Sequence, residues 1–415
     1  MRASVIIPVW NGREYLPACL DALLAQDYPD FEVIVVDNAS ADGSADLVAD
    51  KYPQVRLIRN HSNLGFAGGC NTGLRVATGE MMVLLNQDTV VQAGWLQALA
   101  LCLQNPKVGV AGCKILYPDG ETIQHAGGWI EWPLGLAHHY GYGERDNGQW
   151  DEPRQVEYVT GAAMAFRRSL LELVGLLDED FWPGYFEDTD FCFRVRKAGY
   201  EVWYVPQAVL THAETTSLRD TTSVSCAYER GRLRFVLKHL PPSRFLTEFI
   251  PAGKKYRLPA TQGLDGDPLL LAYLEAIPLA ARILRRQWNA DRSTIEAVVL
   301  ALQSMYRSTF RQIWRDVETP TFPPLREFKF CSAVPVVGPL ISWLRTTCYN
   351  IAARWAVRYL IQQQDAINRD QEALIRDQEA LIRSLELRLT EESAFLAREI
   401  ARLNEELEAL KEEQE

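Results

Sequence analysis

The chain has 415 residues, of which 47% are hydrophobic, so it is longer than one ordinary domain and apolar enough for a sizeable core. The formal net charge is −11, and the fifteen acidic and seven basic residues between Gln362 and Glu415 account for −8 of it. The first 361 residues are therefore nearly neutral, which argues against a broad basic surface for nucleic acid.

The first part of the chain alternates short apolar runs with amphipathic stretches, which predicts an open, mostly parallel sheet with helices on both faces. The expected strands and helices, in chain order, are Ser4–Val9, Leu16–Ala25 (helix), Phe31–Val36, Ala45–Lys51 (helix), Val55–Ile58, Gly68–Ala77 (helix) and Met81–Leu85. Such sheets bind ligands beyond the carboxyl ends of their strands. Asp37 and Asp88 follow two of those ends and are therefore candidates for a ligand site.

The pattern changes between Val108 and Val159, where glycines and aromatic residues are dense and the short strands look antiparallel. The elements expected after it are helices Leu170–Val174 and Asp188–Lys197, strands Val202–Val205 and Val209–Thr211, and helices Leu269–Trp288 and Ser293–Val317. These shifts predict an enzyme domain at residues 1–240, a helical domain at 241–361 and a third segment at 362–415.

The third segment contains a repeat of seven residues. Arg369–Ile375 and Arg376–Ile382 are identical, and a seam of Leu and Ile continues to Leu410, with a four-residue stutter near Leu396. The repeat predicts a coiled coil that makes the protein a homo-oligomer; a lone solvated helix packed on its own domain is the alternative. The preceding segment Phe328–Tyr359 is apolar and aromatic but broken by Pro and Gly. It fits either a membrane-interface helix or an ordinary helical core.

The cysteines and the first residues bear on the location of the protein. Eight cysteines are scattered without a Cys-x-x-Cys pair, and we expect reduced, buried thiols. Those in or beside apolar stretches are Cys19, Cys70, Cys102 and Cys192. No signal-peptide pattern precedes the first strand, and no run of 18 apolar residues could span a bilayer. We expect a cytoplasmic protein, with peripheral contact at the inner face of the cytoplasmic membrane if the segment before the coiled coil is interfacial.

Three polar segments have both a chemical and an ordinary interpretation. Asp37 could accept a hydrogen bond from N3–H of uracil or thymine, although such clusters commonly cap helices and form turns. The glycines within Asn60–Asn71 could bring backbone N–H groups close to a phosphate or ribose, or could serve a loop with positive φ. Asp88 could bind a divalent cation for a diphosphate leaving group, although a single Asp is usually a solvated turn residue.

Two further features share this ambiguity. Glu187, Asp188 and Asp190 lie among aromatic residues at an expected helix start. Acids there are ordinary capping residues, but a carboxylate beside apolar rings can also be tuned as a general base. His212 follows a short strand, and a lone histidine is more often structural. No single segment identifies the function, but the order and the residue types of all five segments together do.

The sequence resembles glycosyltransferase family 2, of the GT-A fold, and particularly its bacterial rhamnosyltransferase-like branch, over residues 1–240. The matching segments, in the family's order, are Val5–Gly12, Val35–Ser44, Asn63–Asn71, Leu85–Thr89, Thr160–Met164 and Phe186–Arg194, with His212. The resemblance implies a Rossmann-like α/β domain for nucleotide-sugar binding. It also implies inverting transfer of a sugar, rhamnose in that branch, from a nucleotide-diphosphate donor to a hydroxyl of a surface glycan or lipid-linked acceptor.

The resemblance also implies residue roles. The residue matching Asp37 reads the base, Asp88 and His212 hold Mn²⁺ or Mg²⁺ with the diphosphate, and Asp188 is the catalytic base. Glu187 is expected to orient Asp188 or an acceptor hydroxyl. The other expected donor-binding residues are Pro8, Asn11, Asn38, Asn63, Gly65, Gly68, Asn71, Asn86 and Gln87. Asn86 departs from the family's Asp-x-Asp motif, so metal binding should depend more on His212.

Other functions fit parts of the sequence. A nicotinamide-dependent enzyme would need a glycine fingerprint after the first strand, where Val9–Arg13 stands instead. A processive membrane synthase would need spanning helices. A catalytically inactive scaffold organised by the coiled coil is the remaining alternative, and the joint presence of all the catalytic-type residues argues against it.

Overall fold

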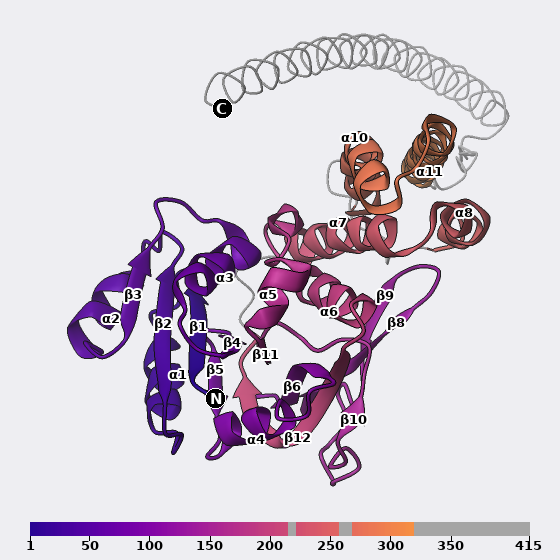
Figure 1. Cartoon of the computed structure of the whole chain (residues 1–415). Coiled ribbons are helices and arrows are strands. Elements are labelled where there is room, and N and C mark those ends of the chain that lie inside the picture. Colours follow the sequence, from indigo (N-terminus) through magenta and orange to yellow (C-terminus); the bar gives the residue numbers. More distant parts are fainter. Residues whose placement is uncertain (215–220, 257–267, 319–415) are drawn as a thin grey trace, which may run out of the picture. The chain divides into compact units, whose positions relative to one another are not determined.

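The computed structural model describes residues 1–214, 221–256 and 268–318 (Figure 1). Residues 1–319 form one compact unit, and residues 320–415 are assigned to a second. The expected interfacial segment at 328–359 and the expected coiled coil at 362–415 lie outside the described residues.

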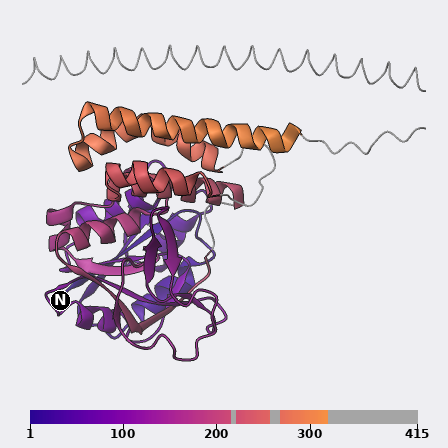
Figure 2. The ribbon, with the colours of Figure 1, turned by 90° about the vertical axis from the view of Figure 1, so that its right-hand side faces the viewer.

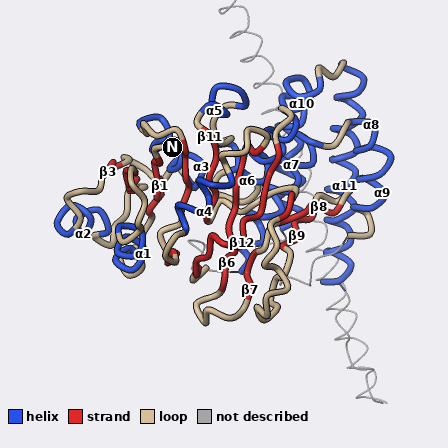
Figure 3. Tube along the Cα trace, turned by 60° about the horizontal axis from the view of Figure 1, so that its bottom comes forward, coloured by secondary structure: helices blue, strands red, loops and turns tan. Residues whose placement is uncertain are grey.

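A ten-stranded mixed sheet forms the centre of the first unit, in the order β10-β12-β6-β11-β4-β1-β2-β3, with β5 beside β12 and β7 beside β6 (Figure 3). Its strands are β1 (Ala3–Val9), β2 (Phe31–Asp37), β3 (Arg56–Arg59), β4 (Met81–Leu85), β5 (Thr89–Val91), β6 (Val108–Leu116), β7 (Ile123–His125), β10 (Arg154–Gln155), β11 (Ala163–Arg167) and β12 (Glu201–His212). β8 (Gly128–Glu131) and β9 (Leu136–His139) form a separate ribbon.

The strand directions differ from the expectation of a mostly parallel sheet. β1, β2, β3 and β4 pair in parallel, as expected, and so do β6 and β12. The pairs β4–β11 and β6–β11 are antiparallel, because β11 enters the sheet between β4 and β6 and runs against both. The sheet is therefore mixed, with its parallel half at the N-terminal end of the chain.

Helices cover both faces of this sheet. Along β1, Val5 and Ile7 point into one core and Ile6 into the other, as the pleat of a strand requires. The helices on the Val5 side are α1 (Leu16–Leu24), α2 (Ser44–Lys51) and α4 (Trp95–Cys102). Those on the Ile6 side are α3 (Gly65–Val76), α5 (Ser169–Val174) and α6 (Glu187–Lys197). Each apolar face of these helices is therefore packed against one face of the sheet.

Helix α3 begins at Gly65, three residues before the expected Gly68, so the glycine-rich segment lies inside the helix rather than before it. A Cβ atom on Gly69 would lie 2.6 Å from Nδ2 of Asn38, and one on Gly73 would collide with Ile6. These glycines therefore let α3 approach β1 and the end of β2 more closely than any larger residue would permit.

The last strand of the sheet is longer than expected. Val202–Val205 and Val209–Thr211 belong to one strand, β12, with a shift of register between Val205 and Val209. Pro206, which has no N–H to donate, lies within this shift. The antiparallel pairing of β12 with β5 places His212 opposite Thr89. The end of β12 therefore lies beside the turn that follows β4.

A helical layer completes the unit (Figure 2). Its elements are α7 (Thr221–His239), α8 (Pro242–Arg244), the π-helical turn η2 (Phe245–Phe249), α9 (Ile250–Gly253), α10 (Pro268–Trp288) and α11 (Arg292–Glu318). Helix α7 contributes to two cores. Phe235 belongs to the core beneath the sheet, and Leu233 and Val236 belong to the core of the helical layer. Among the described helices, none is long and apolar enough to cross a membrane.

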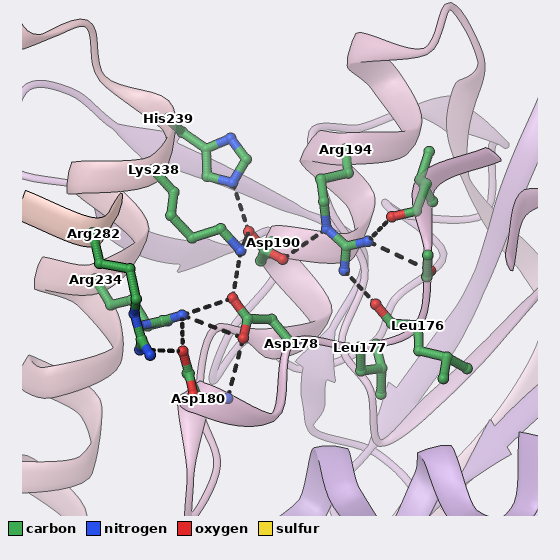
Figure 4. Close-up of polar contacts among 12 residues, drawn as sticks. Leu176, Leu177, Asp178, Asp180, Asp190, Arg194, Arg234, Lys238, His239 and Arg282 are labelled. Atoms are coloured by element: carbon green, nitrogen blue, oxygen red, sulfur yellow. Dashed lines mark hydrogen bonds and ion pairs between the residues drawn. The ribbon is translucent and has the colours of Figure 1, made fainter. Parts of the chain in front are cut away.

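Charged side chains join α6 to α7 (Figure 4). The fully buried carboxylate of Asp190 lies 2.8 Å from Nε of Arg194, 2.6 Å from Nζ of Lys238 and 2.8 Å from Nε2 of His239. Lys238 also pairs with Asp178, which precedes the 3-10 helix η1 (Glu179–Phe181). Burial alone would raise the pKa of Asp190, but these partners hold it well below its usual value. Asp190 is therefore ionised and anchors α6 to the helical layer.

Candidate active site

A cavity of about 580 Å³ lies at the carboxyl ends of β1 and β4 and is closed on one side by the start of α6. Ten residues expected from the sequence line it: Pro8, Asn38, Asn63, Gly65, Asn86, Gln87, Asp88, Glu187, Asp188 and His212. Segments more than a hundred residues apart thus meet in one place. Four expected residues do not line the cavity: Asn11, Asp37, Gly68 and Asn71.

Three of these four have structural roles. The side-chain oxygen of Asn11 accepts a hydrogen bond from the N–H of Ala41 at 2.8 Å. The amide of Asn71 donates to the carbonyl of Leu177 at 2.9 Å and accepts from its N–H at 3.1 Å. Gly68 is buried inside α3. Asn11 and Asn71 therefore join segments that are distant in the chain.

Asp37 lies beside the cavity at the end of β2, opposite Val9 of β1. It is 4% exposed. One carboxylate oxygen accepts a hydrogen bond from the N–H of Ser40 at 3.3 Å, and the other, Oδ1, has no hydrogen-bond partner among the described residues. A buried acceptor without a partner is costly, so this oxygen is suited to a ligand N–H such as that of a pyrimidine base.

Asp88 and His212 come together as expected, with Oδ1 of Asp88 lying 3.2 Å from Nε2 of His212. Nδ1 of His212 lies 2.7 Å from Oε1 of Gln124. The side-chain nitrogen Nε2 of Gln124 lies 3.1 Å from the carboxylate of Glu214. Since a carboxylate only accepts, Gln124 donates to Glu214 and accepts from His212. His212 therefore donates from Nδ1 to Gln124, which leaves Nε2 facing Asp88.

This donor set fits a divalent cation. A ring nitrogen of histidine and a carboxylate oxygen are both groups that bind such an ion. Neighbouring ligands of an octahedral ion with bonds of about 2.1 Å are about 3 Å apart, close to the 3.2 Å that separates Asp88 and His212. Within the described part of the chain no group of three or more His, Cys, Asp or Glu is placed to hold a metal ion. Mg²⁺ commonly takes only one or two protein ligands and completes its shell with substrate phosphate.

The amide of Asn86, where the family has Asp, also contacts His212. Its Nδ2 lies 3.3 Å from Nε2 of His212. The departure from the motif therefore leaves an amide beside the imidazole, with one negative charge fewer than a carboxylate would bring.

Asp188 is held by backbone N–H groups. Gly161 donates to its Oδ2 at 2.6 Å, and Thr189 donates to its Oδ1 at 2.6 Å. A Cβ on Gly161 would lie 2.9 Å from the ring of Phe66 and 3.3 Å from Cβ of Asp188. The expected segment Thr160–Met164 therefore acts on the site through Gly161, which fixes the carboxylate at the cavity wall.

Glu187, beside it in sequence, is in a different environment. It is 5% exposed, and its Oε2 has no hydrogen-bond partner within the described residues. Burial and the neighbouring charge of Asp188 raise the pKa of Glu187 well above its usual value. This shift favours the protonated form of Glu187, which can donate a hydrogen bond, for example to a sugar hydroxyl.

The two acids follow a strained turn. Tyr185 and Phe186 have φ values of 78° and 72°, a conformation that costs non-glycine residues about 1–3 kcal/mol each. Helix α7 supports this Tyr185–Phe186 turn: Tyr228 contacts both rings, and a Cβ on Gly231 would lie 2.5 Å from the carbonyl oxygen of Tyr185. The helical layer therefore contributes to the geometry of the site.

None of the rings that line the cavity was identified as a site residue from the sequence, although Trp10, Phe66 and Phe186 lie in segments that were singled out there. The rings are Trp10, Phe66, His139, Tyr142, Tyr158, Trp182, Tyr185, Phe186 and Tyr228. The density of aromatic residues between Val108 and Val159 was a signal for some of them. Tyr228 had none, because α7 was not expected at all.

Comparisons with known proteins agree with this architecture. Residues 4–175 match the family model described as Glycosyl transferase family 2. The O-antigen biosynthesis protein RfbC of Myxococcus xanthus is 32% identical over 229 residues, which cover 52% of this chain and 18% of that protein. The N-acetylglucosaminyl-diphospho-decaprenol L-rhamnosyltransferase of Mycobacterium tuberculosis is 29% identical over 257 residues, which cover 56% of this chain and 83% of that protein.

A solved structure supports the fold. The crystal structure of GalNAc-T7 with UDP, GalNAc and Mn²⁺ aligns with a TM-score of 0.51 and 15% sequence identity, covering 74% of this chain and 58% of that chain. At this identity the likeness concerns the fold alone. The family match, the relatives and the mixed α/β sheet agree with one another, and residues 4–175 of this chain match glycosyl transferase family 2.

Proposed function

We propose that the protein is an inverting, metal-dependent glycosyltransferase that moves a sugar from a nucleotide-diphosphate donor to a hydroxyl group of a glycan or lipid-linked acceptor. One observation carries the proposal: Asp88, Asp188 and His212, which come from three distant segments, line one cavity. The family supports sugar transfer in general, and this arrangement supports the choice of donor chemistry and mechanism.

The donor would lie across the carboxyl ends of the parallel strands. The free Oδ1 of Asp37 would accept a hydrogen bond from the base, beside the cavity. Asp88 and His212 would hold Mn²⁺ or Mg²⁺ together with the diphosphate. The cation, when bound, neutralises the charge of the leaving group.

Asp188 would act as the general base. Its carboxylate is fixed by two N–H groups and borders the cavity, so it can take the proton from an acceptor hydroxyl as that oxygen attacks the anomeric carbon. The nucleoside diphosphate leaves from the opposite face, and the configuration inverts. Glu187, protonated beside it, would donate a hydrogen bond to a sugar hydroxyl and so align the reactants.

The relatives suggest which sugar to test first. The Mycobacterium tuberculosis relative is named an L-rhamnosyltransferase, and the Myxococcus xanthus relative an O-antigen biosynthesis protein. We therefore propose deoxythymidine-diphosphate rhamnose as the first donor and a growing bacterial surface glycan as the acceptor. The proposal extends to a cytoplasmic enzyme at the inner face of the membrane, assembled as a homo-oligomer by the repeat after Gln362.

A donor screen tests the proposal. The full chain is incubated with Mn²⁺ or Mg²⁺ and a panel of uridine, deoxythymidine and guanosine diphosphate sugars, and release of nucleoside diphosphate is measured. Asp188→Asn should lower turnover roughly 100-fold or more and spare donor binding, because the amide cannot take the proton. Asp50→Asn, at an exposed position of α2, is the matched control. Donor binding without turnover by the wild type would favour the inactive scaffold instead.

A further inference from the structure

His139 is a cavity residue to which neither the resemblance nor the proposed mechanism gives a role. It is the last residue of β9 and lines the same cavity as Asp188. Its Nδ1 lies 3.2 Å from the backbone carbonyl oxygen of Gln124. A carbonyl can only accept, so Nδ1 carries a proton and donates it to this bond.

The ring of His139 is fixed by other rings. Its centroid lies 4.6 Å from that of His125, 5.9 Å from that of Tyr158 and 6.0 Å from that of Tyr142, each at a steep angle. Burial lowers the pKa of His139, so the imidazole is neutral at neutral pH. With Nδ1 protonated, the neutral ring has its lone pair on Nε2, for which the described residues offer no hydrogen-bond partner.

We propose that Nε2 of His139 accepts a hydrogen bond from a hydroxyl group of a sugar bound in this cavity. The inference rests on the proposed function, since it assumes that a sugar enters the cavity. It adds a binding residue to the cavity that Asp188 lines, in a part of the chain that the family motifs do not reach.

The surroundings of Nε2 select the kind of ligand. A lone pair on a neutral imidazole, near the carboxylates of Asp188 and Glu214, repels phosphate oxygens and attracts hydroxyl donors. Gln124 orients two imidazoles: its backbone carbonyl accepts from Nδ1 of His139, and its side-chain oxygen accepts from Nδ1 of His212. One residue of β7 thus holds both rings so that their Nε2 atoms face away from it.

The neighbouring His138 provides a matched control. Successive residues of a strand point to opposite faces, and His138 stacks on Trp129 with centroids 4.4 Å apart and pairs with Glu131 at 2.8 Å. It does not line the cavity. His138→Phe keeps an aromatic ring on Trp129, just as His139→Phe keeps a ring in its aromatic cage, so the two variants differ chiefly in the nitrogen they remove from the cavity.

The test uses the full chain with Mn²⁺ and the donor that the wild type turns over. His139→Phe should lower kcat/KM roughly 10- to 100-fold, because a buried sugar hydroxyl loses its partner. His139→Gln, whose amide oxygen can accept a hydrogen bond, should recover part of this loss, and His138→Phe should match the wild type. Binding of the nucleoside diphosphate with Mn²⁺, measured by calorimetry, should be unchanged in all three variants.

Two rates distinguish the source of the hydroxyl. If the donor sugar supplies it, His139→Phe slows hydrolysis of the donor without acceptor as much as it slows transfer. If the acceptor supplies it, hydrolysis is unchanged and the KM for acceptor rises. Equal transfer by His139→Phe and wild type would overturn the inference and leave the proposed function intact, whereas a wild type without any turnover would overturn both.

Labelling with ¹⁵N-histidine gives a readout independent of turnover. Long-range ¹H–¹⁵N spectra should show a neutral Nδ1–H tautomer for His139, assigned by its loss in His139→Phe. A proton on Nε2 would overturn the inference, because the lone pair would then be absent from the cavity.

Discussion

Replacing Gly231 by Ala tests whether the helical layer sets the geometry of the catalytic acids. A Cβ at this position of α7 would lie 2.5 Å from the carbonyl oxygen of Tyr185 and 3.2 Å from the ring of Phe186. Ordinary contacts are about 3.5 Å or more, so α7 or the Tyr185–Phe186 turn must move by about 1 Å. The turn leads directly into Glu187 and Asp188, and a displacement of this size at a reacting group costs about 100-fold in rate.

The same change should affect stability little. Overpacking lowers the free energy of unfolding by about 1–3 kcal/mol, whereas replacing a glycine inside a helix by alanine raises it by about 1 kcal/mol. The net loss of about 0–2 kcal/mol corresponds to a few degrees in Tm for a unit of this size. We therefore expect kcat of Gly231→Ala to fall about 100-fold, with Tm lowered slightly and the KM for donor unchanged.

Gly253→Ala is the matched control. A Cβ there would lie 3.1 Å from the flexible end of Met305, with the next neighbours at ordinary contact distances of 3.6 Å and 3.7 Å, and the Tyr185–Phe186 turn is not among them. Nucleoside diphosphate release and thermal unfolding are measured for both variants. A Gly231→Ala protein with the kcat of the wild type would refute the reasoning, because it would show that the turn keeps its conformation without close support from α7.

Three further predictions follow from the cation position, the buried acid of α6 and the C-terminal repeat. Turnover should disappear in EDTA, and Asp88→Ala or His212→Ala should each raise the Mn²⁺ concentration needed for half-maximal rate; full activity in chelator would contradict this. Asp190→Asn should lower the free energy of unfolding by about 3 kcal/mol at pH 7. Asp180→Asn, at a half-exposed position, should change the free energy of unfolding much less. Because folding lowers the pKa of Asp190, its contribution is present above about pH 4 and is lost as the pH falls further, so the gap in Tm between wild type and variant should narrow in acid. Light scattering should show an oligomer for the full chain and a monomer for a chain ending at Ile361, and a monomeric full chain at micromolar concentration would exclude assembly through the repeat.

The parallel half of the fold was predictable because its signal is local. The continuous apolar run that becomes β1 needs no information from distant residues. The strand ends that carry Asp37 and Asp88 were predicted for the same reason. In contrast, the direction of β11 depends on which strands flank it, and no local pattern encodes that.

The site was predictable where residues follow strand ends and missed where they come from packing. Asp88 and His212 meet because β5 pairs with the end of β12, a register that the sequence does not display. The roles of Gln124 and Gly231 depend on contacts with segments far away in the chain. A glutamine or a glycine does not suggest such a role by itself, so the roles of Gln124 and Gly231 are seen only in the structure.

The support of the Tyr185–Phe186 turn by α7 also has an evolutionary consequence. The family match ends at residue 175, yet the helix that supports the turn begins at Thr221. A recombination event between relatives with its break between Asp188 and Thr221 would join the turn and the two acids of one parent to the helix of the other, so that two surfaces not selected together would meet. The part of the chain that must be inherited together to keep this geometry is therefore longer than residues 4–175, which match the family model. We expect substitutions in α7 to accompany substitutions in the turn rather than those in the rest of the helical layer.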